Sequence, residues 1–162
     1  MISVVASDLA LIFNRCIECG VFPDLMKHSK IIPLFKAGST SDPTNYRPIS
    51  VLPTFSKIFE KIILDQLQTH FSASKILHRK QFGFRRGRST SDAGVELLEN
   101  IFSAWEDKQD ALGVFFYLSQ AFDCVFHETL IRKLHYYGIR NTALDLLISY
   151  LGKRIQRVEV NG

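Results

Sequence analysis

The sequence is poor in cysteine and has no apolar run long enough to cross a membrane. Its 162 residues include only three cysteines, Cys16, Cys19 and Cys124, which are too few for a disulfide framework. No apolar run approaches the roughly 20 residues that a membrane-spanning helix needs, so we expect no membrane partner. The first ten residues lack a basic segment and contain Asp8, so we predict no secretory signal and expect an intracellular, reducing environment.

Cys16 and Cys19 form a C-x-x-C pair, a spacing that occurs in zinc and redox sites. No second pair and no nearby pair of histidines accompanies it in the sequence. Both cysteines fall near the end of a helical pattern. We therefore favour a structural role for the pair, with zinc or redox chemistry as the alternative.

The composition is that of a globular protein with a slight basic excess. Hydrophobic residues make up 46% of the chain, and its length suffices for one domain with a core. The formal net charge is +4 and the isoelectric point is about 9.0. This excess is compatible with a polyanionic partner but does not require one.

Hydrophobic periodicity predicts five helices and three strands. We expect helices at residues 1–19, 55–71, about 89–106, 128–137 and 142–151, and strands at residues 30–36, 112–117 and 154–160. Pro33 places the first strand at an edge or a bulge of its sheet, because proline cannot donate a ladder hydrogen bond.

Polar residues and glycines mark the expected ends of these elements. The expected helix caps are Thr54 or Ser56, Ser89 or Ser91, and Asn141, and the expected terminating glycines are Gly20, Gly138 and Gly152. Asn161 and Gly162 form a strong hairpin-turn signal after the third strand, which predicts a returning strand beyond them.

The most informative stretch runs from residue 114 to residue 127 and reads V-F-F-Y-L-S-Q-A-F-D-C-V-F-H. Apart from Gly113, the residues from Leu112 to Tyr117 are apolar or aromatic, which predicts a strand buried on both faces. Ser119, Gln120 and Ala121 follow at once. A buried strand that ends at a polar turn is a frequent place for chemistry, because a rigid element aims the side chains of the turn.

This stretch resembles the first catalytic motif of reverse transcriptases from non-LTR retrotransposons, F-x-D-L-S-K-A-F-D-x-V-x-H. The matching residues are Phe115, Leu118, Ser119, Ala121, Phe122, Asp123, Val125 and His127. Three positions depart from the pattern. Tyr117 stands where the family has its metal-binding aspartate, Gln120 replaces a lysine, and Phe126 replaces a frequent aspartate.

A second block, P-L-F-K-A-G followed by N-Y-R-P-I-S, is similar to the fingers segment of the same family. The resemblance implies that Lys36 and Arg47 bind the incoming triphosphate. Fixed cations suit a triphosphate, and arginine can donate two parallel hydrogen bonds to it. Without the resemblance, the same residues would read as a solvated loop lysine and a structural arginine.

A third block, H-R-K-Q-F-G-F-R-R-G-R-S-T at residues 78–90, is similar to the second fingers block of the family. Its cations are interleaved with Phe82, Phe84 and two glycines, and they are candidate nucleic-acid-binding residues: Arg79, Lys80, Arg85, Arg86 and Arg88. A solvated loop is the alternative. We expect weak, non-specific binding to RNA or DNA.

The resemblance implies an α/β fold in which helices pack on a truncated antiparallel sheet. We expect one partial reverse transcriptase-like domain over residues 1–162, with the fingers of a right-hand polymerase and flanking helices over about residues 1–110 and an incomplete palm over residues 111–162. An unpaired edge of that sheet predicts self-association.

The family uses Mg²⁺ held by three aspartates, one from the first motif and two from a Y-x-D-D hairpin. Here the first is Tyr117, and no Asp-Asp pair or G-x-P-Q-G block occurs in the sequence; both would follow Gly162. We therefore expect no productive metal binding. Asp123 is expected to cap the turn into the next helix. Phe122 matches the family position that packs under the sugar, with a core role as its alternative.

Three functional hypotheses follow. The chain could be part of an active polymerase whose other half is supplied elsewhere, a retained RNA- or DNA-binding module without catalysis, or a decayed fragment of a transposed element. Tyr117 argues against the first. The sequence favours the third over the second, and the basic block at residues 78–90 supports the second.

Overall fold

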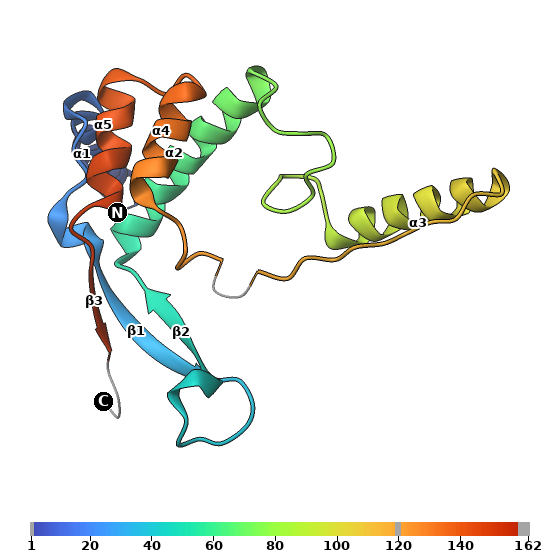
Figure 1. Ribbon diagram of the computed structural model, residues 1–162. Helices are drawn as coiled ribbons and strands as arrows, with labels where there is room; N and C mark the ends of the chain where they lie inside the picture. Colours follow the sequence, from blue (N-terminus) through green and yellow to red (C-terminus); the bar gives the residue numbers. More distant parts are fainter. Residues whose placement is uncertain (1, 119–120, 159–162) are drawn as a thin grey trace. The chain divides into compact units, whose positions relative to one another are not determined.

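The computed structural model describes residues 2–118 and 121–158, with side chains from residue 5 onward. The chain divides into two compact units. The first combines Met1–Gln68 with Val125–Gly162, and the second is Thr69–Cys124. Figure 1 shows the order of the elements along the chain.

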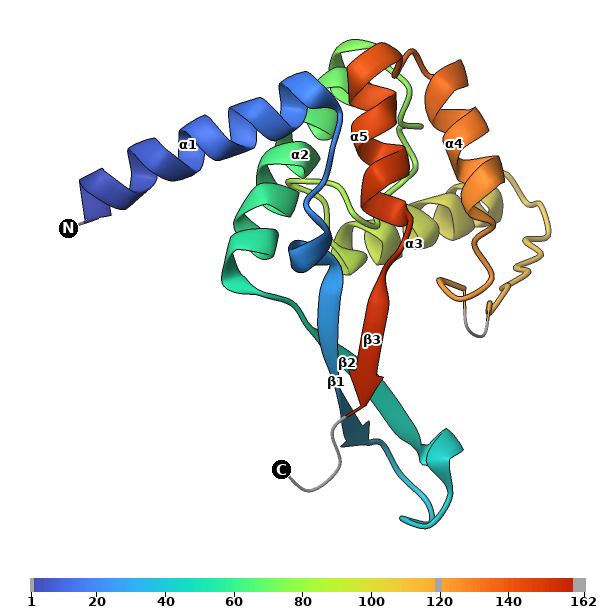
Figure 2. The same cartoon turned by 90° about the vertical axis from the view of Figure 1, so that its left-hand side faces the viewer.

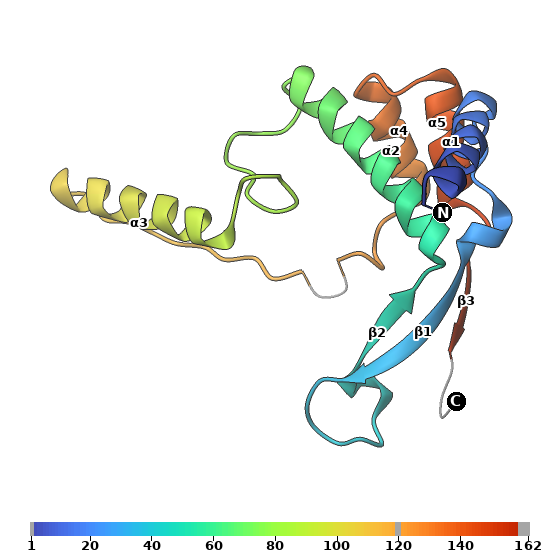
Figure 3. The ribbon, with the colours of Figure 1, turned by 180° about the vertical axis from the view of Figure 1, so that it is seen from behind.

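The first unit contains a mixed three-stranded sheet. Its strands are β1 (His28–Phe35), β2 (Tyr46–Val51) and β3 (Ile155–Val158), in the order β2-β1-β3 (Figures 1 and 3). β2 runs antiparallel to β1, whereas β3 runs parallel to it. The expectation of an antiparallel sheet is therefore wrong for β3, because a helical connection rather than a hairpin brings that strand back.

One further expectation about the sheet needs correction, and one of its strands was not predicted. β1 is the central strand, so Pro33 does not lie on an edge strand. Its partner in the register is Pro48 of β2, which the sequence did not mark as a strand. Neither proline has an N–H to donate, so both suit positions where that group would point away from the partner strand. The turn signal at Asn161 and Gly162 lies outside the described residues.

Four helices belong wholly or mainly to the first unit, close to the expected ranges: α1 (Ile2–Cys19), α2 (Thr54–Ala73), α4 (His127–Tyr136) and α5 (Asn141–Leu151). α5 packs against α1 and α4 (Figure 2). The core contains Phe13, Phe22, Phe59 and Leu146. The Phe59 ring stacks between the rings of Phe13 and Phe22, with centroid distances of 4.7 and 5.1 Å.

The helix ends confirm the glycine signals but not all of the caps. Gly20 and Gly138 adopt φ values of +65° and +88°, a conformation that glycine reaches without strain. Asn141 was expected to cap α5, but Arg140 occupies the cap position and makes no side-chain cap bond. Ser56 is buried inside α2, and its hydroxyl donates to Oε1 of Glu60 rather than capping the helix.

The second unit contains α3 (Thr90–Glu106) and irregular segments on either side of it. Ser89 caps α3, as one of the two predicted alternatives: its hydroxyl accepts from the Asp92 N–H, and the Asp92 carboxylate accepts from the Ser89 N–H. None of the described side chains of Thr69–Cys124 is buried. This unit therefore has no core of its own among those residues.

The predicted buried strand at residues 112–117 is the largest error of the sequence interpretation. Leu112, Phe116 and Tyr117 are 92%, 88% and 89% exposed, and the stretch has no regular secondary structure. A strand buried on both faces needs a paired strand and covering side chains. Within the described residues, the three strands of the sheet pair only with one another, and nothing covers this stretch.

Candidate nucleotide and nucleic-acid site

The end of the β1–β2 hairpin brings Lys36 and Arg47 together. Arg47 pairs with Leu34 in the strand register, and the Lys36 N–H donates to the Asn45 carbonyl at 2.8 Å, which extends the ladder by one step. Lys36 is two residues beyond Leu34, so its side chain and that of Arg47 lie on one face as diagonal neighbours. Both are exposed. Two cations so placed can bind an anion.

The loop between these two residues is held by its own polar groups. Asn45 Nδ2 donates to the Ser39 carbonyl at 2.9 Å, and the Tyr46 hydroxyl donates to the Thr40 carbonyl at 2.8 Å. Asp42 accepts from the hydroxyl and the N–H of Thr44, and these bonds hold the pKa of its carboxyl below the usual value. The loop thus fixes the spacing between Lys36 and Arg47.

The second unit carries the five cations of the basic block, and several already have partners. Lys80 Nζ lies 3.0 Å from Glu96 Oε1 of α3. Arg85 donates to the His78 carbonyl at 3.0 Å, and the Arg88 guanidinium lies 5.3 Å from the centroid of the Phe82 ring. Arg79 and Arg86 are exposed. A phosphate would therefore compete with a carboxylate for Lys80.

Three of these five cations line an open hollow of about 480 Å³ against α3. Its charged lining residues are Arg79, Lys80, Arg88, Glu96 and Glu99. The hollow carries both signs of charge. It is therefore less suited to a polyanion than a purely basic surface would be.

Tyr117, Phe122 and Asp123 lie in the part of the second unit that has no regular secondary structure. Phe122 is 77% exposed, and its ring centroid lies 6.0 Å from that of Phe84. The alternative prediction, that Phe122 belongs to the core, is therefore wrong. Asp123 is exposed and lies in a turn. Phe126 occupies the cap position of α4 without a side-chain bond, so the expected capping by Asp123 is also wrong.

A family model described as reverse transcriptase (RNA-dependent DNA polymerase) matches residues 34–162. The chain belongs to the reverse transcriptase family. Its relatives include the probable RNA-directed DNA polymerase from transposon BS and the RNA-directed DNA polymerase from mobile element jockey, both of Drosophila melanogaster. Each is 37% identical, over 85% and 95% of this chain respectively.

Within this family, the chain resembles the reverse transcriptases of non-LTR retrotransposons. A putative 115 kDa protein in type-1 retrotransposable element R1DM of Drosophila melanogaster is 31% identical over 86% of this chain. The chain spans only 16%, 17% and 13% of the lengths of the BS, jockey and R1DM relatives. It therefore corresponds to a small part of each of these proteins.

Reverse transcriptases generally use Mg²⁺, but the residues described here do not fit that ion. Mg²⁺ prefers several carboxylate oxygens in octahedral geometry. Residues 2–118 and 121–158 contain no cluster of three or more His, Cys, Asp or Glu side chains that could hold a metal. The motif resemblance, which no structural observation tests, predicts that Tyr117 stands where the family has its aspartate. The same described part of the chain contains no helix both long and apolar enough to span a bilayer.

The sequence interpretation missed Lys30 and Arg157. Both lie in strands, on the same face of the sheet as Lys36 and Arg47. Positions 30, 32, 34 and 36 alternate along the strand and therefore share a face, so the sequence could have placed Lys30 on the face of Lys36. Arg157 could not be placed, because its parallel partner strand begins 127 residues earlier in the chain.

Proposed function

We propose that this chain is the nucleic-acid-binding part of a reverse transcriptase and that it does not extend primers by itself. In this proposal, residues 1 to about 110, which include the β1–β2 hairpin, correspond to the fingers of a right-hand polymerase and its flanking helices, and residues 111–162 correspond to the start of the palm. The observation that carries the proposal is Tyr117, which replaces the family's metal-binding aspartate.

The substitution acts through charge and size. A phenol is neutral at the pH at which an aspartate is ionised, so it offers far less attraction to a divalent cation. A tyrosine is also bulkier than an aspartate and would intrude on the space for a metal ion. Asp123 is exposed and belongs to no group of three or more metal-ligating side chains among the described residues, so we do not assign it the role of the missing carboxylate.

Primer extension tests this proposal. The 162-residue chain should not extend a labelled primer on a homopolymer template with Mg²⁺ or Mn²⁺. Tyr117→Asp should not restore extension by itself, since a two-metal reaction needs further carboxylates. Extension by the unmodified chain that disappears in Asp123→Asn would overturn the proposal and assign Asp123 to catalysis.

A second candidate function is that of a retained RNA- or DNA-binding module that takes no part in reverse transcription, and the cations of the basic block favour it. Replacing Arg85, Arg86 and Arg88 with glutamate should abolish most binding in filter assays, and binding by the unmodified chain should fall steeply from low to physiological salt. Arg15, Arg132 and Arg140 are exposed arginines of the first unit and serve as a matched triple control. Equal loss in both variants would show that only net charge matters.

A further inference from the structure

Two arginines precede the first turn of α3 at a fixed spacing from a serine. Arg86 and Arg88 stand five and three residues before Ser91. Among the serines and threonines of the sequence, only Ser91 has arginines at both of these spacings. In an extended segment, residues two apart point to the same side, about 7 Å from each other. The two guanidinium groups can then bind two carboxylates of one partner, each through a pair of parallel hydrogen bonds.

The segment from Arg86 to Ser91 is accessible along its whole length. Each of its residues is exposed, and regular structure begins only with Thr90 at the start of α3 (Figure 1). The backbone turns at Gly87, which has a φ of +73°, and a side chain there would meet no atom of the described residues within 4 Å. A partner can therefore approach this segment without displacing other parts of the second unit.

The hydroxyl groups of Ser89 and Ser91 differ in their hydrogen bonds. The Ser89 hydroxyl donates to the Asp92 carboxylate at 2.9 Å and accepts from the Asp92 N–H at 3.2 Å. No hydrogen bond joins the Ser91 hydroxyl to another described residue. The Ser91 oxygen is therefore available for reaction, whereas the Ser89 oxygen must first leave the cap of α3.

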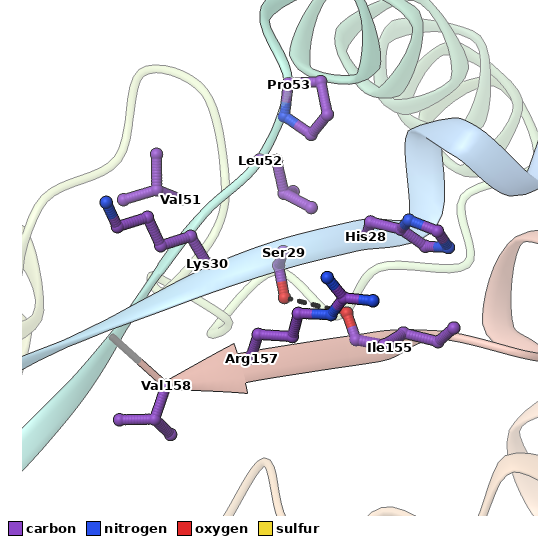
Figure 4. A pocket seen from close by; sticks show the side chains of 9 residues that line it. All are labelled: His28, Ser29, Lys30, Val51, Leu52, Pro53, Ile155, Arg157 and Val158. Atoms are coloured by element: carbon purple, nitrogen blue, oxygen red, sulfur yellow. Dashed lines mark hydrogen bonds between the residues drawn. The ribbon is translucent and has the colours of Figure 1, made fainter. Parts of the chain in front are cut away.

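A serine of the first unit shows the opposite case. Ser29 also has basic neighbours in the sequence, Lys27 and Lys30. However, it is only 8% exposed, and its hydroxyl donates to the Ile155 carbonyl at 3.5 Å, from β1 to β3 (Figure 4). A modifying enzyme cannot reach an oxygen held within a sheet in this way. Basic neighbours alone are therefore not sufficient, and accessibility distinguishes Ser91 from Ser29.

The first turn of α3 can open at small cost. An enzyme that binds residues 86–91 in an extended form must unwind Ser91 from this turn and so break the Ser89 cap. Loss of one such cap shifts the equilibrium by about fivefold. None of the described side chains of the second unit is buried, so opening the turn removes no core packing.

We propose that Ser91 is the phosphate acceptor of a serine/threonine protein kinase that recognises arginine. The Ser91 Oγ attacks the γ-phosphorus of ATP, and an O–P bond forms there. The bond between that phosphorus and the β–γ bridging oxygen breaks, and ADP leaves. The hydroxyl proton passes to the catalytic carboxylate of the kinase. Arg86 and Arg88 determine specificity in this reaction, because they bind carboxylates of the kinase and not the reacting atoms.

Phosphorylation of Ser91 changes the charge of the basic block. A phosphoserine carries a charge of about −1.5 to −2 at neutral pH and accepts hydrogen bonds from guanidinium groups. Arg88 lies near the first turn of α3: the Ser89 hydrogen bonds chiefly hold the pKa of Asp92 below its usual value, and the charge of Arg88 adds to this effect. A phosphate on Ser91 therefore binds Arg88 and Arg86 and withdraws them from a nucleic acid.

This regulatory consequence rests on the proposed function, because it assumes that the basic block binds nucleic acid. The modification of Ser91 does not rest on it. The two parts of the proposal are therefore tested by separate measurements, one of phosphate transfer and one of nucleic-acid binding.

Phosphate transfer is measured on the 162-residue chain with Mg²⁺ and ATP labelled in its γ-phosphate. The probe is the catalytic domain of a serine/threonine kinase that selects arginine three and five residues before its acceptor. Peptide mass spectrometry then locates the label. Ser91→Ala should lose most of the label, whereas Ser91→Thr, which keeps a hydroxyl, should retain it. Ser89→Ala should also retain it, because Ser89 is not the acceptor.

The arginines are tested by the kinetics of the same kinase. Arg86→Gln/Arg88→Gln should raise KM for the chain and leave kcat nearly unchanged, because these side chains bind the kinase without touching the transferred phosphoryl group. Arg79→Gln/Lys80→Gln is the matched control, since it removes two exposed cations of the same basic block at other spacings. Its KM should equal that of the unmodified chain.

Fluorescence anisotropy with labelled oligo(U) measures the consequence for binding. Phosphorylation should weaken binding and make the slope of log K against log salt shallower by about 1.4, since each of the two withdrawn arginines removes about 0.7. Ser91→Ala, treated with the same kinase and ATP, should keep the slope of the untreated chain.

The possible results separate the site from its consequence. Label on Ser89 or Thr90 in place of Ser91, or no label at all, overturns the site. An equal rise in KM for both double variants overturns the role of Arg86 and Arg88. Label on Ser91 with an unchanged slope overturns the regulatory consequence while the proposed function stands. No binding by the untreated chain at low salt overturns the proposed function and the consequence, whereas label on Ser91 still supports the site.

Discussion

Arg154 and Glu60 form an ion pair, with Nη2 3.2 Å from Oε1, between residues 94 positions apart in the chain. The two side chains are only 25% and 22% exposed, and the buried Ser56 hydroxyl donates to the same carboxylate oxygen. This contact joins α2 to the turn that precedes β3. Arg154→Met should lower the free energy of unfolding by about 1–2 kcal/mol, because it leaves a half-buried carboxylate without its charged partner.

Urea denaturation followed by circular dichroism measures this loss. The control is Lys61→Met, which removes a 2.8 Å ion pair with Asp65 whose side chains are 64% and 55% exposed. An exposed pair of this kind contributes about 0–1 kcal/mol. Equal destabilisation by the two substitutions would show that the Arg154–Glu60 contact has no special role.

Tyr150 makes the stability of the first unit sensitive to high pH. Burial raises the pKa of its phenol above the usual value of 10.0, and the nearby Glu60 carboxylate adds to this shift. In the unfolded chain the phenol loses its proton near pH 10, whereas the folded state retains it to higher pH. The contribution of the protonated Tyr150 phenol to the stability of the folded state is therefore complete below about pH 10. It is lost as pH rises through the pKa of Tyr150 in the folded state.

Melting midpoints measured from pH 9 to pH 11 test this prediction. Tyr150→Phe should have a shallower decline than the unmodified chain over this range. Tyr136→Phe is the control, because Tyr136 is 83% exposed. If Tyr136→Phe flattens the decline as much as Tyr150→Phe does, burial of Tyr150 is not the cause.

The Ser89 cap should control the helicity of the second unit. Ser89→Ala removes an acceptor for the Asp92 N–H, a change that typically costs about 1 kcal/mol. Ser91→Ala is the matched control, because Ser91 is the second residue of α3 and is not its N-cap. Backbone chemical shifts of α3 should lose helical character only in Ser89→Ala. Equal effects of the two serines would contradict the assignment of the cap.

The exposed run at residues 112–118 should drive association between copies of the chain. It contains no charge and no proline, and uncharged extended segments of this kind pair readily with identical segments. Phe116→Lys should reduce the concentration dependence of the sedimentation coefficient, because it places a charge in that contact. Leu25→Lys, at a residue that is 81% exposed in the first unit, should not.

Local chemistry made several elements predictable. The apolar spacing of α2 and α3, the serine before α3 and the glycines after α1 and α4 act through residues within one or two turns of one another. The family resemblance indicated Lys36 and Arg47 as triphosphate-binding residues, which stays a prediction, and the hairpin register places both on one face.

Partners distant in the sequence were not predictable in the same way. The run from Leu112 has the composition of a buried strand, but composition cannot supply the neighbouring strands that bury it. β2 was not predicted because Pro48 interrupts a short segment of mixed polar and apolar residues, and the pairing of Pro48 with Pro33 is evident only from the register. The parallel position of β3 depends on the helices that carry the chain back to β1.

The parallel pairing of β1 with β3 also affects how the chain folds during translation. The Ser29 hydroxyl donates to the Ile155 carbonyl, and the ribosome adds Ile155 only 126 residues after Ser29. At bacterial to eukaryotic elongation speeds of roughly 5–20 residues per second, that delay is about 6–25 seconds. Throughout this interval, the backbone groups on the edge of β1 that β3 later covers have no partner strand.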